Sequence, residues 1–172
     1  MKPETQYTIH TYSNLEEKLN VWSHFAGLIL SVIAMVLLVF RAIELASIWA
    51  IISFPIFGLS MIVLYLASTL YHHSKSEKLR YRLNIFDHAA IYILIAGSYT
   101  PFVLVSLHGT EGFAIFAIVW SIALVSVIFK IFFTGRFNVL SNILYVAMGW
   151  LIIFSFNNLM TNLDFNGLVW LI

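Results

Sequence analysis

The stretch 19-LNVWSHFAGLILSVIAMVLLVF-40 contains no charged residue across the 22 positions that separate Lys18 from Arg41. A helix needs about 20 apolar residues to cross the roughly 30 Å hydrocarbon core of a bilayer, so this stretch predicts a membrane-spanning helix. It is too long for the apolar part of a cleavable signal peptide. Runs such as IAMVLLVF do not alternate apolar and polar residues, which excludes the strand pattern of a membrane β-barrel.

Four further uncharged gaps of 18 to 30 residues follow along the chain. The five predicted spans are 20–40, 47–71, 88–107, 113–133 and 139–159, and the last residues of the chain read as the start of a sixth. The chain of 172 residues is 61% hydrophobic, with a mean hydropathy of +0.93, and 10% of it is charged, whereas soluble domains carry about 25% charged residues. We therefore expect an all-α, multi-pass transmembrane helical bundle, with residues 1–14 as a polar tail and 15–172 as the membrane domain.

Positive charge is distributed unevenly between the two sides of the predicted bundle. Eight of the nine Lys and Arg residues fall on the side of the N-terminus: Lys2, Lys18, Lys75, Lys78, Arg80, Arg82, Lys130 and Arg136. Arg41 falls on the other side. Because the cytoplasmic loops of membrane proteins carry the excess of Lys and Arg, we expect a protein of the cell membrane with a cytoplasmic N-terminus.

Titratable side chains collect on that same side, at the ends of three predicted spans. In YLASTLYHHSKSEKLR, residues 65–80, Ser68 and His72 are four residues apart and share one helix face, whereas His73 is turned away by about 100°. A second stripe, with spacings of three and four residues, begins the first span: Glu17, Asn20 and His24. Asp87 opens the third span. Ionisable groups are costly this close to hydrocarbon and tend to face an interior cavity, so we expect three helix ends to meet around a shared polar site.

Each of these residues also has a plain structural interpretation. A single His at a membrane interface is commonly a boundary residue, and a carboxylate such as Asp87 suits the first turn of a helix, with Asn84 as its cap. Together, however, a His, a Ser and an Asp at one depth could supply a metal ligand, a group that orients it and a carboxylate for a bound water. The chain has no cysteine, so a metal here would need His, Asp or Glu.

Four motifs occur in a fixed order: ExxNxxSH from Glu17, SxxxH from Ser68, FDHAAIYILIAGSYTPF from Phe86 and YVAMGW from Tyr145. This combination resembles the hemolysin III branch of the progesterone and adiponectin receptor (PAQR) family. The resemblance implies a seven-helix membrane fold and a zinc ion held by three histidines and a water that is hydrogen-bonded to an aspartate. It makes His72 a zinc ligand, Ser68 its neighbour and Asp87 the partner of the water. The residues that match the first motif would support the site: Glu17, Asn20 and His24.

The chain departs from the family pattern towards its C-terminus. The family's other two zinc ligands form an HxxxH pair on the seventh helix, and no HxxxH occurs in this sequence. The chain thus reads as lacking the last one to two transmembrane helices, either as a shortened product of a longer gene or as a fold that does without them. His24 could substitute only in an improvised site, so we expect weak or no zinc binding by this chain alone.

Three functions stay open from the sequence. The first is a zinc-dependent membrane hydrolase of a lipid amide or ester, with Asp87 as general base beside Ser68. The second is a non-enzymatic receptor or membrane-homeostasis protein with structural zinc. The third is the cytolysis that the family name implies, although no cationic amphipathic helix supports it. Membrane lipids are the expected partners, and no basic patch outside the membrane-flanking loops indicates nucleic acid.

Three further residues are expected to serve architecture. Pro101 should bend the third span, because proline removes a backbone donor. Gly149 should allow a neighbouring helix to approach closely. Trp120 is expected to be an interfacial or lipid-facing anchor, because tryptophan is enriched at membrane interfaces.

Overall fold

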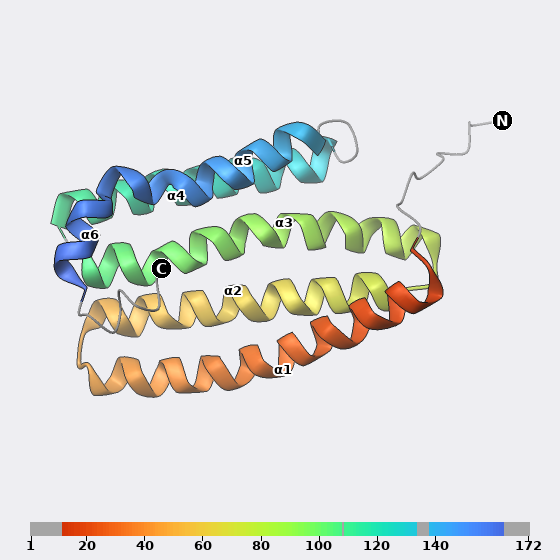
Figure 1. Cartoon of the computed structure of the whole chain (residues 1–172), viewed down its shortest axis with the longest axis horizontal. Helices are drawn as coiled ribbons and strands as arrows, with labels where there is room; N and C mark the ends of the chain where they lie inside the picture. Colours follow the sequence, from red (N-terminus) through yellow and green to blue (C-terminus); the bar gives the residue numbers. More distant parts are fainter. Residues whose placement is uncertain (1–11, 108, 134–137, 164–172) are drawn as a thin grey trace.

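The structure, a computed structural model, describes residues 12–107, 109–133 and 138–163, and these residues form helices and no strand (Figure 1). The α-helices in chain order are α1 (Asn14–Glu44), α2 (Ile48–His73), α3 (Glu77–Pro101), α4 (Gly109–Phe133), α5 (Asn138–Trp150) and α6 (Phe156–Asn162). A π-helix (Phe102–Ser106) continues α3, and a 3-10 helix (Leu151–Ser155) joins α5 to α6.

Five helical segments of the described residues are long and apolar enough to cross a membrane, which confirms the five predicted spans. They are Asn14–Glu44, Ile48–His73, Glu77–Ser106, Gly109–Phe133 and Val139–Asn162. The predicted all-α, multi-pass helical bundle is therefore confirmed. The expected start of a sixth span falls in residues 164–172, which lie outside the described residues.

The helices extend past the predicted ends of the spans. Helix α1 has 31 residues, which at 1.5 Å per residue is about 46 Å and exceeds the hydrocarbon thickness. Helix α3 begins at Glu77 instead of residue 88, with Ser76 at its N-cap position. Asp87 therefore lies about three turns into α3, and the expectation that Asp87 opens this helix with Asn84 as its cap is wrong. A helix can continue through the headgroup layer, where charged residues remain solvated, so a charge does not mark its end.

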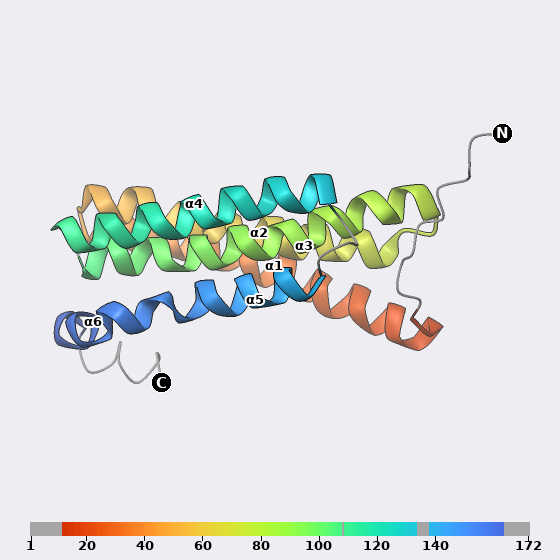
Figure 2. The same cartoon turned by 90° about the horizontal axis from the view of Figure 1, so that it is seen from above.

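Helix α3 is at the centre of the bundle. Helices α1, α2 and α3 lie side by side, and α4 and α5 pack against α3 on its other flank (Figures 1 and 2). Half of the most apolar window of the α3 span is buried inside the bundle, compared with 11% for α1. The outer helices turn large apolar side chains outward, such as Phe132 and Phe154, which are 74% and 83% exposed. Such extensive exposed apolar surface fits contact with lipid.

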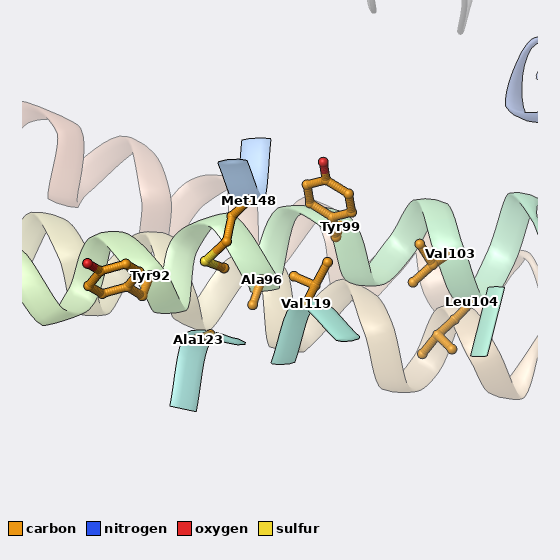
Figure 3. Close-up of a cluster of buried hydrophobic side chains, with 8 residues drawn as sticks. All are labelled: Tyr92, Ala96, Tyr99, Val103, Leu104, Val119, Ala123 and Met148. Carbon is orange, nitrogen blue, oxygen red and sulfur yellow. The ribbon is translucent and has the colours of Figure 1, made fainter. Parts of the chain in front are cut away.

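The main buried cluster follows α3 between its middle and its C-terminal end (Figure 3). Its members come from α3, the π-helix, α4 and α5: Tyr92, Ala96, Tyr99, Val103, Leu104, Val119, Ala123 and Met148. Small residues bring α2 and α3 together next to this cluster, because a Cβ atom at Gly97 would lie 2.3 Å from Ser60 Oγ. Helix α3 can therefore approach α2 closely at Gly97, because this residue has no side chain.

One of the architectural expectations, that for Gly149, is wrong. A Cβ atom at Gly149 would meet no atom within 4 Å, so this glycine does not serve a close helix approach. Trp120 lies in the middle of α4, is partly buried and donates a hydrogen bond to Thr100 Oγ1 at 3.0 Å, so part of its surface packs inside the bundle. Pro101 is the last residue of α3, and a π-helix follows it directly; the bend expected at Pro101 stays a prediction.

Candidate functional site at the ends of α1, α2 and α3

The start of α1, the end of α2 and the start of α3 meet at one end of the bundle (Figure 1). The connections at 45–47 and 74–76 are short, so the three helices alternate in direction. Ser13 and Glu16 fix the first turn of α1 through a capping box, in which Ser13 N donates to Glu16 Oε2 at 2.7 Å and Glu16 N donates to Ser13 Oγ at 3.3 Å. This cap places the next residue, Glu17, at the point where the three helices meet.

The Glu17 carboxylate connects α1 to both neighbouring helices. Its Oε2 atom lies 2.9 Å from His72 Nδ1 at the end of α2, and its Oε1 atom accepts a hydrogen bond from Arg80 Nη2 on α3. The three side chains are 19%, 8% and 18% exposed, in the order Glu17, His72 and Arg80. Because water is largely excluded, this carboxylate is held by two charge-assisted contacts rather than by a solvated surface pair.

The His72 ring is enclosed by polar and aromatic groups. The His24 ring stacks on it with centroids 5.5 Å apart and an interplanar angle of 11°. Tyr71 and Tyr12 contribute ring contacts with centroid separations of 4.7 and 5.4 Å. Asn20 Nδ2 is 3.5 Å from His72 Nδ1, farther than the Glu17 carboxylate, so the carboxylate is the better partner. With Nδ1–H donating to Glu17, a neutral His72 would leave Nε2 as an acceptor or metal ligand.

A second contact joins α2 to α3 one helical turn deeper. Ser68 Oγ donates a hydrogen bond to Asp87 Oδ1, and Ser68 is buried while Asp87 is partly buried. Ser68 and His72 both face the other helices, as their spacing predicted, and His73 is exposed. The six residues singled out from the sequence therefore lie at one end of the bundle in two groups. Glu17, Asn20 and His24 contact His72, and Ser68 contacts Asp87. Their catalytic and metal-binding roles remain predictions.

Sequence reasoning missed three members of the site, which are Arg80, Tyr71 and Tyr12. Arg80 contacts Glu17, and its guanidinium carbon lies 5.0 Å from the centroid of the buried Tyr71 ring, within the range of a cation–π interaction. Tyr12 packs its edge against His72, and burial raises the pKa of its phenol, assisted by the nearby acidic groups Tyr71, Glu17 and Asp87. Arg80 precedes Asp87 by seven residues, which is two helical turns, and this spacing would have placed both on one face had α3 been extended to Glu77.

The residues present fit part of a zinc site. His72, with its Nδ1 atom beside a carboxylate, has the arrangement typical of a metal-ligating histidine. Zinc needs at least three protein ligands, and no three His, Cys, Asp or Glu side chains within the described ranges are grouped to hold a metal ion. The rings of His24 and His72 are stacked in nearly parallel planes. The described residues thus offer one ligand and its orienting carboxylate, not a complete site.

Comparison with known proteins agrees with the motifs. The chain is 49% identical over 152 residues to the "Hemolysin-3 homolog" of Bacillus subtilis (strain 168), an alignment that covers 88% of this chain and 71% of the relative. It is 45% identical over 155 residues to "Hemolysin-3" of Bacillus cereus, covering 88% of this chain and 69% of that protein. No solved structure matches. A sequence model of the family described as "Haemolysin-III related" matches residues 12–172, and the chain therefore belongs to this family.

Proposed function

We propose that this haemolysin-III related membrane protein is a hydrolase of a lipid amide or ester, with the polar site as its reaction centre. The observation that carries the proposal is the hydrogen bond from Ser68 to Asp87, one turn from the Glu17-oriented His72. A carboxylate and an imidazole at the edge of a hydrocarbon layer are costly, and such groups commonly mark functional sites. At this depth the site would be accessible to a lipid whose acyl chains stay in the membrane.

In this proposal the Asp87 carboxylate accepts a proton from the water that attacks the acyl carbonyl carbon. The new bond joins the water oxygen to that carbon, the bond to the amide nitrogen or ester oxygen breaks, and the leaving group takes up the proton. Ser68 holds the carboxylate in place. His72 would be one ligand of a zinc ion, and a bound zinc would supply a Lewis acid, but the described residues do not complete a zinc site. We propose that this chain by itself binds zinc weakly or not at all.

The test uses the purified chain in lipid bicelles, with and without added zinc, and fluorescent short-chain lipid amides and esters as substrates. We expect Asp87→Asn to abolish hydrolysis, because an amide cannot accept the proton from water. Glu44→Gln is the matched control, since Glu44 is an exposed carboxylate at the opposite end of α1. Hydrolysis that survives Asp87→Asn, or no hydrolysis of either substrate class by the unaltered chain, would contradict the proposal. Metal analysis after dialysis against a chelator reports zinc separately.

A non-enzymatic receptor or membrane-homeostasis function is the second candidate. This candidate is favoured because the polar contacts connect different helices. Glu17 joins α1 to α2 and α3, and Ser68 joins α2 to α3. Such contacts could fix the relative positions of helix ends and respond to a ligand by rearranging. This candidate predicts that neither the unaltered protein nor the Asp87→Asn variant hydrolyses lipid. It also predicts that the variant keeps the cellular response of the unaltered protein.

The names of the two relatives raise cytolysis as a third candidate. Lysis by a pore would need a polar face along a whole span, whereas the outer helices of the described part expose mainly large apolar side chains. Liposomes loaded with a self-quenched dye test this candidate directly. Dye release by purified protein at a level above that caused by heat-denatured protein would support it.

A further inference from the structure

A pocket of about 120 Å³ lies at the end of the bundle away from the polar site. It is lined by Ser98, Tyr99, Phe102, Gly149, Ile152 and Leu159. These residues belong to the last turns of α3, the π-helix and the segment from the end of α5 to α6, and Figure 1 shows where these elements lie. Two changes of helix type border it, because the π-helix begins at Phe102 and the 3-10 helix contains Ile152. Departures from regular α-helix frequently occur at functional sites.

The hydroxyl groups in the pocket wall are already engaged within the protein. Tyr99 donates its O–H to the Gly149 carbonyl at 2.9 Å and accepts the Ile152 N–H at 3.0 Å. Ser98 donates to the Ile95 carbonyl of its own helix at 2.8 Å. The rest of the lining consists of apolar side chains and the open space beside Gly149. The pocket therefore offers packing to a hydrocarbon and little hydrogen bonding to a headgroup, a sugar or an ion.

We propose that this pocket binds the terminal part of a lipid acyl chain. It is partly open, and lipid-facing side chains follow on the same segment: Trp150, Ile153 and Phe154 are 65%, 56% and 83% exposed. An apolar cavity of about 150 Å³ takes up a molecule the size of benzene, so this volume suits a few methylene groups. A chain that enters from the bilayer gains dispersion contacts that an empty cavity would lack. The proposal does not depend on hydrolysis at the polar site.

Photo-crosslinking in detergent-free nanodiscs tests this binding. One phospholipid carries a diazirine near the end of its acyl chain, a second carries it near the ester carbonyl, and labelled residues are identified by mass spectrometry. Leu159 is 1% exposed and Ile153 is 56% exposed. Surface accessibility alone predicts labelling of Ile153 only, whereas an acyl chain in the pocket also labels Leu159. We expect the chain-end probe to label both residues.

Filling the pocket should remove the Leu159 signal selectively. In Gly149→Leu the new side chain extends into open space, so Leu159 labelling should be lost while Ile153 labelling persists. Ala147→Leu adds the same side chain to an exposed position two residues away and should change neither signal. Ser98→Leu fills the pocket from α3 and replaces Gly149→Leu if that variant does not fold. Absence of Leu159 labelling in the unaltered protein, labelling by the ester-proximal probe instead, or labelling that survives both filling variants would overturn the proposal.

Discussion

Replacing Glu17 by Gln tests whether the polar contacts hold the three helix ends together. Glu17 places one oxygen at His72 and the other at Arg80, and each of the three side chains is less than one-fifth exposed. Glutamine keeps the shape but removes the charge, and it has one acceptor oxygen in place of two. Arg80 therefore keeps its charge in a largely buried position without a carboxylate.

The expected loss follows from the number and burial of these contacts. A hydrogen bond to a charged group contributes about 1.5–3 kcal/mol to stability, and residual solvent contact reduces this value. We expect Glu17→Gln to lower the free energy of unfolding by about 2 kcal/mol, which is more than a tenfold change in the equilibrium constant. The Arg41–Glu44 pair is the internal control, because its side chains are 63% and 66% exposed at a distance of 3.0 Å. Glu44→Gln should change the unfolding free energy by less than about 0.5 kcal/mol.

The assay is reversible unfolding in mixed micelles as the fraction of denaturing detergent rises, followed by circular dichroism. A double-mutant cycle with Arg80→Met then isolates the Glu17–Arg80 coupling from other effects of either change. Equal losses for Glu17→Gln and Glu44→Gln would refute the reasoning, because burial would then have no influence. A coupling free energy indistinguishable from zero would show that Arg80 and Glu17 act independently.

Three further predictions concern packing and orientation. Gly97→Ala should destabilise the bundle by about 1–3 kcal/mol, since its Cβ would lie 2.7 Å from Ser60 Cβ, and Ser60→Gly should restore most of the loss in the same unfolding assay; no rescue would contradict the contact. Tyr99→Phe removes hydrogen bonds to Gly149 and Ile152 and should lower the free energy of unfolding by about 1–3 kcal/mol; an unchanged unfolding free energy would contradict this. The charge distribution predicts a cytoplasmic N-terminus, so a cysteine introduced at position 14 should react with an impermeant reagent only after the cell membrane is opened, and labelling of intact cells would reverse the topology.

The five spans could be predicted from the sequence because charge is so unfavourable in hydrocarbon that its absence marks the membrane interior. The ends of the helices could not be predicted in the same way. Backbone hydrogen bonding continues into the headgroup layer, where Glu77 and its neighbours are exposed, so α3 begins well before its uncharged stretch. Asp87, which the sequence places at the start of the third span, therefore lies in the interior of α3.

The site was predictable where it depended on spacing within one helix. Ser68 and His72 share a face because four residues make about one turn, and this does not depend on the rest of the fold. Arg80 could not be found in this way, because its role depends on how far α3 extends and how it is rotated towards α1. The role of Gly149 could not be predicted from its small size either. This glycine borders open space, and a Cβ atom there would not contact a neighbouring helix.

The arrangement of contacts determines which substitutions can report on function alone. Helix α1 has the lowest buried fraction of the five spans and packs along α2, so the Glu17–Arg80 contact is a direct link from its first turns to α3. Changes at Glu17 should therefore alter helix docking and any chemistry together. Ser68 and Asp87 join α2 and α3, which already pack closely over their length. Asp87→Asn keeps a hydrogen-bond acceptor for Ser68 while removing the base, and for this reason it separates a reaction at the site from the stability of the site.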